Sequence, residues 1–322
     1  MTSTFGPTTT TDDVLDGAEL DGRRFVITGA ATGLGRESAR ALAAHGAHVT
    51  LLARSAERAE EARDSLLATV PGASCETGVV DLGDLSSIRS FADDFLVDHD
   101  AVDVLINNAG VMACPEGRTV DGFETQFGTN HLGHFLLTAR LAPALLRGDA
   151  PRVVTLSSAG HSRADVDLED WNFERTPYSA WTAYGRSKTA NALFARELAR
   201  RAGGLGLHSW SVHPGGIVTD LGRHLNDELL AEMFAFATER SGGGRMEFKS
   251  VEAGAATQVW AATSEDPGLL AANGAYLADC GLGELDADPG TNGFLPYLLD
   301  DDRAAALWEL SEELVGERFD LP

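Results

Sequence analysis

Short apolar runs alternate with longer stretches of helical periodicity from residue 24 to residue 277. The apolar runs are bounded by turn residues and therefore predict buried strands. The expected strands cover residues 25–27, 48–52, 74–80, 102–106, 152–157, 207–212 and 274–277. Apolar residues at helical spacing predict helices over residues 36–46, 56–70, 85–99, 123–146 and 178–201. Strands that alternate with helices indicate a parallel sheet covered by helices on both faces.

The predicted architecture is one α/β domain of Rossmann type, with a doubly wound and mostly parallel sheet, over residues 21–322. Ligands of such sheets bind at the carboxyl ends of the strands. Residues 1–20, rich in Thr and Asp, are expected to form a flexible N-terminal tail.

Residues 221–250 are expected to cover the substrate. Apolar residues at helical spacing are followed there by three consecutive glycines, Gly242 to Gly244, which suits a helix with a hinge. These apolar residues are Leu229, Leu230, Met233, Phe234 and Phe236. A surface helix packed on the core is the alternative interpretation.

Composition narrows the classes of function. The net charge of −24 makes nucleic acid and anionic membrane surfaces unfavourable partners. Cys75, Cys114 and Cys280 show no metal-ligand or disulfide spacing, which is typical of a reducing compartment. The N-terminus lacks the pattern of a signal peptide, and no apolar run is long enough to span a bilayer. We therefore expect a cytoplasmic protein without membrane insertion.

A glycine-rich turn follows the first expected strand, as T-G-A-A-T-G-L-G over residues 28–35. Glycines let the backbone approach a pyrophosphate, and the helix that follows offers free N–H groups and a positive dipole end. The strand–turn–helix context strengthens this weak motif.

Two arginines indicate which dinucleotide binds. NAD-dependent enzymes place an acidic residue at the end of the second strand to bind the ribose 2′-hydroxyl, whereas this chain has Arg54. A guanidinium matches a 2′-phosphate, and Arg36 is expected to add a second charge. NADP(H) is therefore favoured over NAD(H), unless both arginines are only surface cations.

Tyr184 and Lys188 stand four residues apart at the start of a long expected helix, so they share one helix face. Lysine is rare here, since Lys188 and Lys249 are the only two. An ammonium group near a phenol favours the phenolate and is expected to lower its pKa, which suits acid–base work on a carbonyl oxygen. Ser157 and Ser158 end the fifth expected strand, where a hydroxyl can reach the substrate.

These motifs together resemble the short-chain dehydrogenase/reductase family, through the glycine spacing, Asn107-Asn108-Ala109-Gly110, Tyr184-x-x-x-Lys188 and the Pro-Gly…Thr segment over residues 214–219. Residues 130–135, 213–215 and 307–311 resemble its retinol dehydrogenase and protochlorophyllide reductase-like branch. The resemblance runs from about residue 21 to 315 and implies a catalytic tetrad of Asn130, Ser158, Tyr184 and Lys188.

The resemblance also implies a mechanism and a cofactor site. Tyr184 protonates the developing alkoxide, Ser158 stabilises it, Lys188 holds the nicotinamide ribose, and Asn130 positions a water that links Lys188 to solvent. The cofactor-binding residues expected from motif chemistry and resemblance together are Gly29, Thr32, Gly33, Leu34, Gly35, Arg36, Arg54, Asp81, Leu82, Asn108, Ala109, Gly110, Tyr184, Lys188, Pro214, Gly215, Ile217 and Thr219.

The expected function is hydride transfer between NADP(H) and a carbonyl or alcohol group of a lipophilic small molecule. A non-catalytic NADP(H)-binding regulator or redox sensor is the alternative outside enzymology, although Tyr184 and Lys188 argue for turnover. The glycine spacing disfavours an epimerase or dehydratase, and the segment around Ser158 lacks the first glycine of a hydrolase elbow. His131 and His134 have no further candidate ligand, so no metal site is expected. The resemblance leaves the oligomeric state open, because the family often forms homo-oligomers through the two long helices, at residues 123–146 and 178–201 here, and also includes monomers.

Overall fold

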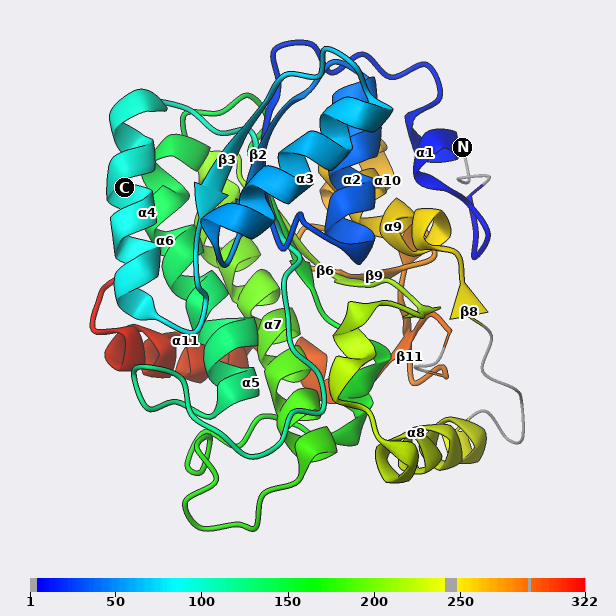
Figure 1. Cartoon of the computed structure of the whole chain (residues 1–322). Coiled ribbons are helices and arrows are strands. Elements are labelled where there is room, and N and C mark those ends of the chain that lie inside the picture. Colours follow the sequence, from blue (N-terminus) through cyan, green and yellow to red (C-terminus); the bar gives the residue numbers. More distant parts are fainter. Residues whose placement is uncertain (1–4, 241–247, 289–290, 322) are drawn as a thin grey trace.

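The computed structural model describes residues 5–240, 248–288 and 291–321. Its centre is an eight-stranded sheet with the strand order β10-β9-β6-β5-β4-β1-β2-β3 (Figure 1). All strands are parallel except β10, which forms an antiparallel hairpin with β9. In sheet order from the opposite edge the strands are β3 (Cys75–Val79), β2 (His48–Ala53), β1 (Arg24–Thr28), β4 (Val104–Asn107), β5 (Arg152–Leu156), β6 (His208–His213), β9 (Tyr276–Ala278) and β10 (Gly281–Leu282). The fold prediction is therefore confirmed.

Helices cover both faces of the sheet, each over its own apolar core. One core joins the sheet to α4 (Leu85–Asp98), α6 (Gly133–Leu145), α7 (Ala180–Ala202) and α11 (Asp301–Val315). The other joins it to α2 (Gly33–Ala44), α3 (Ala56–Thr69), α9 (Val251–Thr263) and α10 (Pro267–Ala271). Strand order reverses between β1 and β4, and this crevice is where such folds bind ligands.

The helix expected over residues 123–146 is divided in the structure. It consists of α5 (Thr125–Phe127), a π-helical turn η1 (Gly128–Leu132) and α6. The start was misplaced because the Glu124 side chain caps the helix, accepting hydrogen bonds from the backbone nitrogens of Gln126 and Phe127. The π turn adds one residue to the helical repeat, a feature that often marks functional sites. Asn130 lies within it.

The prediction of a flexible tail over residues 1–20 is wrong for residues 5–20, whereas residues 1–4 lie outside the described part. A short helix, α1 (Thr11–Leu15), begins with a capping box between Thr10 and Asp13. Leu15 and Leu20 are buried in the core beneath α2 and α9. Two of the Thr and Asp residues in this segment, Thr10 and Asp13, cap α1.

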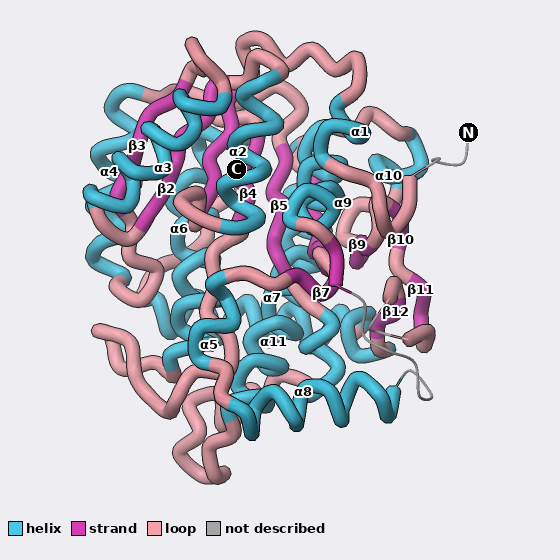
Figure 2. Tube along the Cα trace, turned by 45° about the vertical axis from the view of Figure 1, so that its right-hand side comes forward, coloured by secondary structure: helices cyan, strands magenta, loops and turns pink. Residues whose placement is uncertain are grey.

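The helix α8 (Asp227–Arg240) lies at the periphery of the molecule, away from the sheet (Figure 2). Among the described residues, no helix is both long and apolar enough to cross a membrane.

Candidate active site

A large cavity of about 1540 Å³ opens along the carboxyl ends of the central strands. Its volume exceeds the roughly 300–1,000 Å³ of ordinary small-molecule pockets, so it has room for a dinucleotide together with a substrate. Of the residues expected at the site, all line this cavity except Gly35, Arg36 and Asn130. The structure therefore brings together motifs that are more than 180 residues apart in the chain.

The glycine-rich turn forms the floor of the cavity between β1 and α2. Gly29 and Gly33 adopt left-handed backbone conformations, with φ of +66° and +55°, which disfavour other residues. Gly35 has a different role, because a Cβ atom there would lie 2.4 Å from the carbonyl oxygen of Gly29. It allows close packing inside the turn and does not face the cavity.

Asn108 holds this turn against β4. Its side-chain nitrogen donates a hydrogen bond to the carbonyl oxygen of Thr28 at 2.8 Å, and its backbone nitrogen donates to Thr28 Oγ1 at 2.9 Å. The Thr28 hydroxyl also lies 2.9 Å from Nε2 of buried His134. Thr28 and His134 were not predicted as site residues, although the sequence places Thr28 directly before the glycines.

Two arginines line the cavity near the end of β2, where a 2′-phosphate is expected. Arg54 lines the cavity as expected, and Arg58 on α3 lines it as well. Arg36 does not, since its side chain is exposed outside the cavity. Arg36 follows Gly35 on α2, and the helix turns it to the solvent side.

Tyr184, Lys188 and Ser158 line the same wall of the cavity. Tyr184 and Lys188 lie on α7, with Lys188 Nζ 5.7 Å from the centre of the Tyr184 ring. Lys188 Nζ donates a hydrogen bond to the carbonyl oxygen of Leu156 at 2.9 Å, which ties α7 to the end of β5. Ser158 follows this strand and caps the short helix η2 (Ala159–Arg163).

The predicted lowering of the Tyr184 pKa is wrong for the protein without cofactor. Burial raises the pKa of Tyr184 to about 12, although a hydrogen bond with Ser158 acts in the lowering direction. Burial also lowers the pKa of Lys188 to about 8. The phenol is therefore neutral at physiological pH, because loss of solvation outweighs the hydrogen bond with Ser158.

The two serines at the end of β5 differ in their contacts. The Ser157 hydroxyl donates to the backbone carbonyl oxygen of Lys188 at 2.8 Å and is buried. Ser158 Oγ accepts a hydrogen bond from the backbone nitrogen of Gly160 at 3.0 Å. Ser158 also forms a hydrogen bond with the side chain of Tyr184, so its hydroxyl lies beside the phenol in the cavity.

Asn130 is fully buried behind the cavity wall. Its side chain accepts a hydrogen bond from the Val111 nitrogen at 2.8 Å, donates to the Val111 oxygen at 2.9 Å, and donates to Ser187 Oγ at 2.9 Å. These bonds tie the π turn to the loop after β4 and to α7. In this structure Asn130 joins the elements that carry the site.

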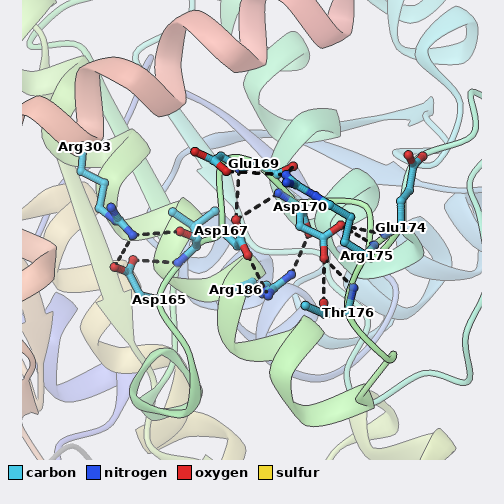
Figure 3. Close-up of polar contacts among 10 residues, drawn as sticks. Asp165, Asp167, Glu169, Asp170, Glu174, Arg175, Thr176, Arg186 and Arg303 are labelled. Carbon is cyan, nitrogen blue, oxygen red and sulfur yellow. Dashed lines mark hydrogen bonds and ion pairs between the residues drawn. The ribbon is translucent and has the colours of Figure 1, made fainter.

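An insert between β5 and α7, over residues 165–176, supports the start of the catalytic helix (Figure 3). The Asp170 carboxylate accepts hydrogen bonds from the backbone nitrogens of Glu174, Arg175 and Thr176. Arg186, two residues after Tyr184, donates to the Asp170 carbonyl oxygen at 2.8 Å. These contacts attach the insert to α7 close to Tyr184.

The segment over residues 221–250 borders the cavity where it is described. Leu230, Met233, Phe234 and Phe236 line the cavity, whereas Leu229 packs near Trp181. The expected hinge, Gly242 to Gly244, lies outside the described residues. After it, β8 (Phe248–Lys249) pairs with β7 (Gly216–Ile217), directly behind the Pro-Gly turn. Lys249 forms an ion pair with Asp279 in the cavity wall.

No cluster of three or more metal-binding side chains occurs among the described residues. His131 Nε2 lies 2.8 Å from Ser311 Oγ, and His134 is bonded to Thr28 and Asn130. The two imidazoles therefore have structural partners.

Comparisons with known proteins agree with this arrangement. The sequence matches the short chain dehydrogenase family over residues 23–230. Retinol dehydrogenase 12 of Mus musculus is 41% identical over 262 residues, covering 81% of this chain and 79% of that protein. An uncharacterised protein of Mycobacterium paratuberculosis has a solved structure that is 36% identical, with a TM-score of 0.73 and coverage of 98% of this chain and 100% of that chain. A short chain dehydrogenase from Burkholderia cenocepacia, solved in complex with NADP, is 25% identical, with a TM-score of 0.62 and coverage of 80% and 96%.

Proposed function

The chain belongs to the short-chain dehydrogenase/reductase family, in its retinol dehydrogenase-like branch, and we propose that it transfers a hydride between NADP(H) and the carbonyl or alcohol group of a lipophilic small molecule. The observation that carries the proposal is the convergence of Ser158, Tyr184 and Lys188 on the wall of a cavity whose floor is the glycine-rich turn.

The residues of the cavity fit a nicotinamide dinucleotide phosphate. Gly29 and Gly33 open the turn to a pyrophosphate, and the free N–H groups at the start of α2 suit its negative charge. Arg54 and Arg58 offer guanidinium groups for a 2′-phosphate, and no acidic residue stands at the end of β2 to bind a ribose hydroxyl. The related protein solved with NADP supports the same choice.

Bound NADPH supplies the hydride that reduces the carbonyl carbon. Tyr184 donates a proton to the developing alkoxide, which its neutral phenol, with a pKa of about 12, is equipped to do. The Ser158 hydroxyl donates a hydrogen bond to the same oxygen and stabilises its charge. Lys188 carries a positive charge below a pH of about 8 and contributes it to the polar end of the site.

Tyr184 donates its proton in carbonyl reduction and, as the phenolate, accepts one in alcohol oxidation, so both directions use the same groups. The ratio of reduced to oxidised cofactor sets the direction of turnover. The substrate end of the cavity is lined by Met112, Trp181, Leu225, Met233 and Phe234, which suits a lipophilic molecule.

A fluorescence titration with NADPH and NADH, on the wild type and on Arg54→Asp, tests the cofactor. We expect tighter binding of NADPH that weakens selectively in the variant; equal binding of the two nucleotides contradicts the proposal. A screen of lipophilic aldehydes that follows nicotinamide absorbance tests the reaction. Tyr184→Phe should lose nearly all turnover while it keeps NADPH binding, and turnover retained in that variant overturns the catalytic assignment.

A further inference from the structure

Arg163 is a charged residue in the apolar part of the cavity that the mechanism does not use. It ends η2, the short helix that begins after Ser158. Its guanidinium carbon lies 4.3 Å from the centre of the Trp181 ring, on the first turn of α7, and 4.1 Å from the centre of the Phe236 ring, on α8. The guanidinium is thus held between two aromatic rings within the cavity wall.

Both rings contact the guanidinium, and its N–H donors form few hydrogen bonds within the described chain. A guanidinium has five such donors around its edge. The edge donates one long hydrogen bond within the described chain, from Nη2 to the Glu232 carbonyl oxygen at 3.4 Å. Burial lowers the pKa of Arg163 to about 10, so the group is still charged at neutral pH. The Glu232 carboxylate acts on its pKa in the raising direction, but no carboxylate among the described residues lies within ion-pair distance of Arg163.

We propose that Arg163 binds a carboxylate on the substrate, at the end remote from the reacting carbonyl. The inference rests on the proposed function and narrows its substrate class to apolar aldehydes or ketones that carry an acid group. Planar, bidentate pairing with a carboxylate is the interaction for which a guanidinium edge is shaped. The apolar side chains of Met233 and Phe234 then contact the chain between the two polar ends.

Two other roles for Arg163 fit the observations less well. The cavity already has Arg54 and Arg58 beside β2 for a cofactor phosphate, whereas Arg163 lies with α7 and α8. Arg163 is not required to hold α8 against α7, because another contact joins these two helices. Trp181 Nε1 on α7 donates a hydrogen bond to the Leu229 carbonyl oxygen on α8 at 3.3 Å. Holding α8 uses only one of the five edge donors, in the long bond from Nη2 to the Glu232 carbonyl oxygen.

The kinetic test compares ω-oxodecanoate with its methyl ester, with NADPH as the second substrate, in the wild type, Arg163→Gln and Arg163→Lys. We expect the wild type to prefer the acid by about 10- to 100-fold in kcat/KM, the size of one charged hydrogen-bonded contact. The preference should approach one in Arg163→Gln, mainly through KM, and be partly kept in Arg163→Lys. A wild type that handles acid and ester alike overturns the proposal, and so does Arg163→Gln if its preference is unchanged.

A binding test keeps the inference separate from the reaction. Calorimetric titration of the NADP⁺-loaded protein with decanoate and with decanamide should show tighter binding of the acid, lost in Arg163→Gln. If neither oxo compound is turned over but decanoate binds through Arg163, the proposed function fails and the carboxylate site stands. Equal binding of acid and amide overturns the site. NADPH binding that weakens in Arg163→Gln also overturns it, in favour of a cofactor contact.

Discussion

Gly160 lies directly against the ring of Tyr184, so close that a Cβ atom on Gly160 would come within 2.6 Å of Tyr184 Cε1. The glycine belongs to η2, and its backbone nitrogen also donates to Ser158 Oγ at 3.0 Å. One residue without a side chain therefore sets the position of two of the three polar groups at the site.

Gly160→Ala should displace the Tyr184 ring and lower kcat by roughly 100-fold, since a shift of about 1 Å in a reacting group has an effect of that order. Steady-state kinetics with an aldehyde substrate measures the effect. Gly204→Ala is the matched control, because no atom lies within 4 Å of the added Cβ and kcat should be unchanged. Full activity in Gly160→Ala would mean that the ring does not need this space.

Arg58→Gln should weaken NADPH binding about tenfold and leave NADH binding unchanged, because loss of one phosphate contact costs roughly 1.4 kcal/mol. The same fluorescence titration on Arg36→Gln provides the control, since Arg36 is exposed outside the cavity. A larger effect from Arg36 than from Arg58 would contradict the placement of the two residues.

Three buried histidines should make the protein sensitive to acid. Burial lowers the pKa of His131 to about 3, of His134 to about 4 and of His213 to about 3. An unfolded histidine has a pKa near 6.5, so the unfolded state binds more protons than the folded state between about pH 4 and 6.5. Stability is therefore fully present above pH 6.5 and falls as the pH decreases towards 4.

Urea unfolding at a series of pH values measures this slope. His131→Gln should reduce the loss of unfolding free energy between pH 6.5 and 4, because one buried proton acceptor is removed. His224→Gln is the control, since the His224 side chain is exposed and contributes less. A slope that His131→Gln leaves unchanged would show that other groups govern acid unfolding.

Leu15→Ala should lower the free energy of unfolding by about 2–5 kcal/mol, the usual cost of truncating a buried leucine. Leu15 is 0% exposed beneath α2 and α9, so its loss leaves a cavity. Glu19→Ala, at an exposed position nearby, should have little effect on the urea midpoint. Equal stability of the two variants would restore the interpretation of this segment as a flexible tail.

Local patterns in the sequence predicted the parts of the site that depend on neighbouring residues. The glycine turn after β1 and the four-residue step from Tyr184 to Lys188 are of this kind, because strand and helix geometry fix where their side chains go. The exposed position of Arg36, outside the cavity, depends on where α2 starts, because a shift of a few residues changes which side of the helix faces the cavity.

Local sequence patterns do not predict contacts between segments that are distant in the chain. Nothing in the sequence near Arg163 indicates that Phe236 will lie over it, since the contact depends on where α8 returns to the domain. The pKa of Tyr184 was predicted in the wrong direction because burial depends on the whole fold, whereas the lysine is visible in the sequence. The capping box of Thr10 and Asp13 has the same composition as a loop, so these residues alone do not predict the helix α1.

The paired strands β7 and β8 connect the part of the cavity expected to bind the nicotinamide with the part expected to bind the substrate. Gly216 and Ile217 follow the turn expected to hold the nicotinamide, and their partners Phe248 and Lys249 end the segment that borders the substrate. A ligand that immobilises one strand also immobilises the other, so the free energies of the two binding events are coupled, and such coupling is reciprocal. Occupancy of either half of the cavity therefore changes the affinity of the other half by the same factor.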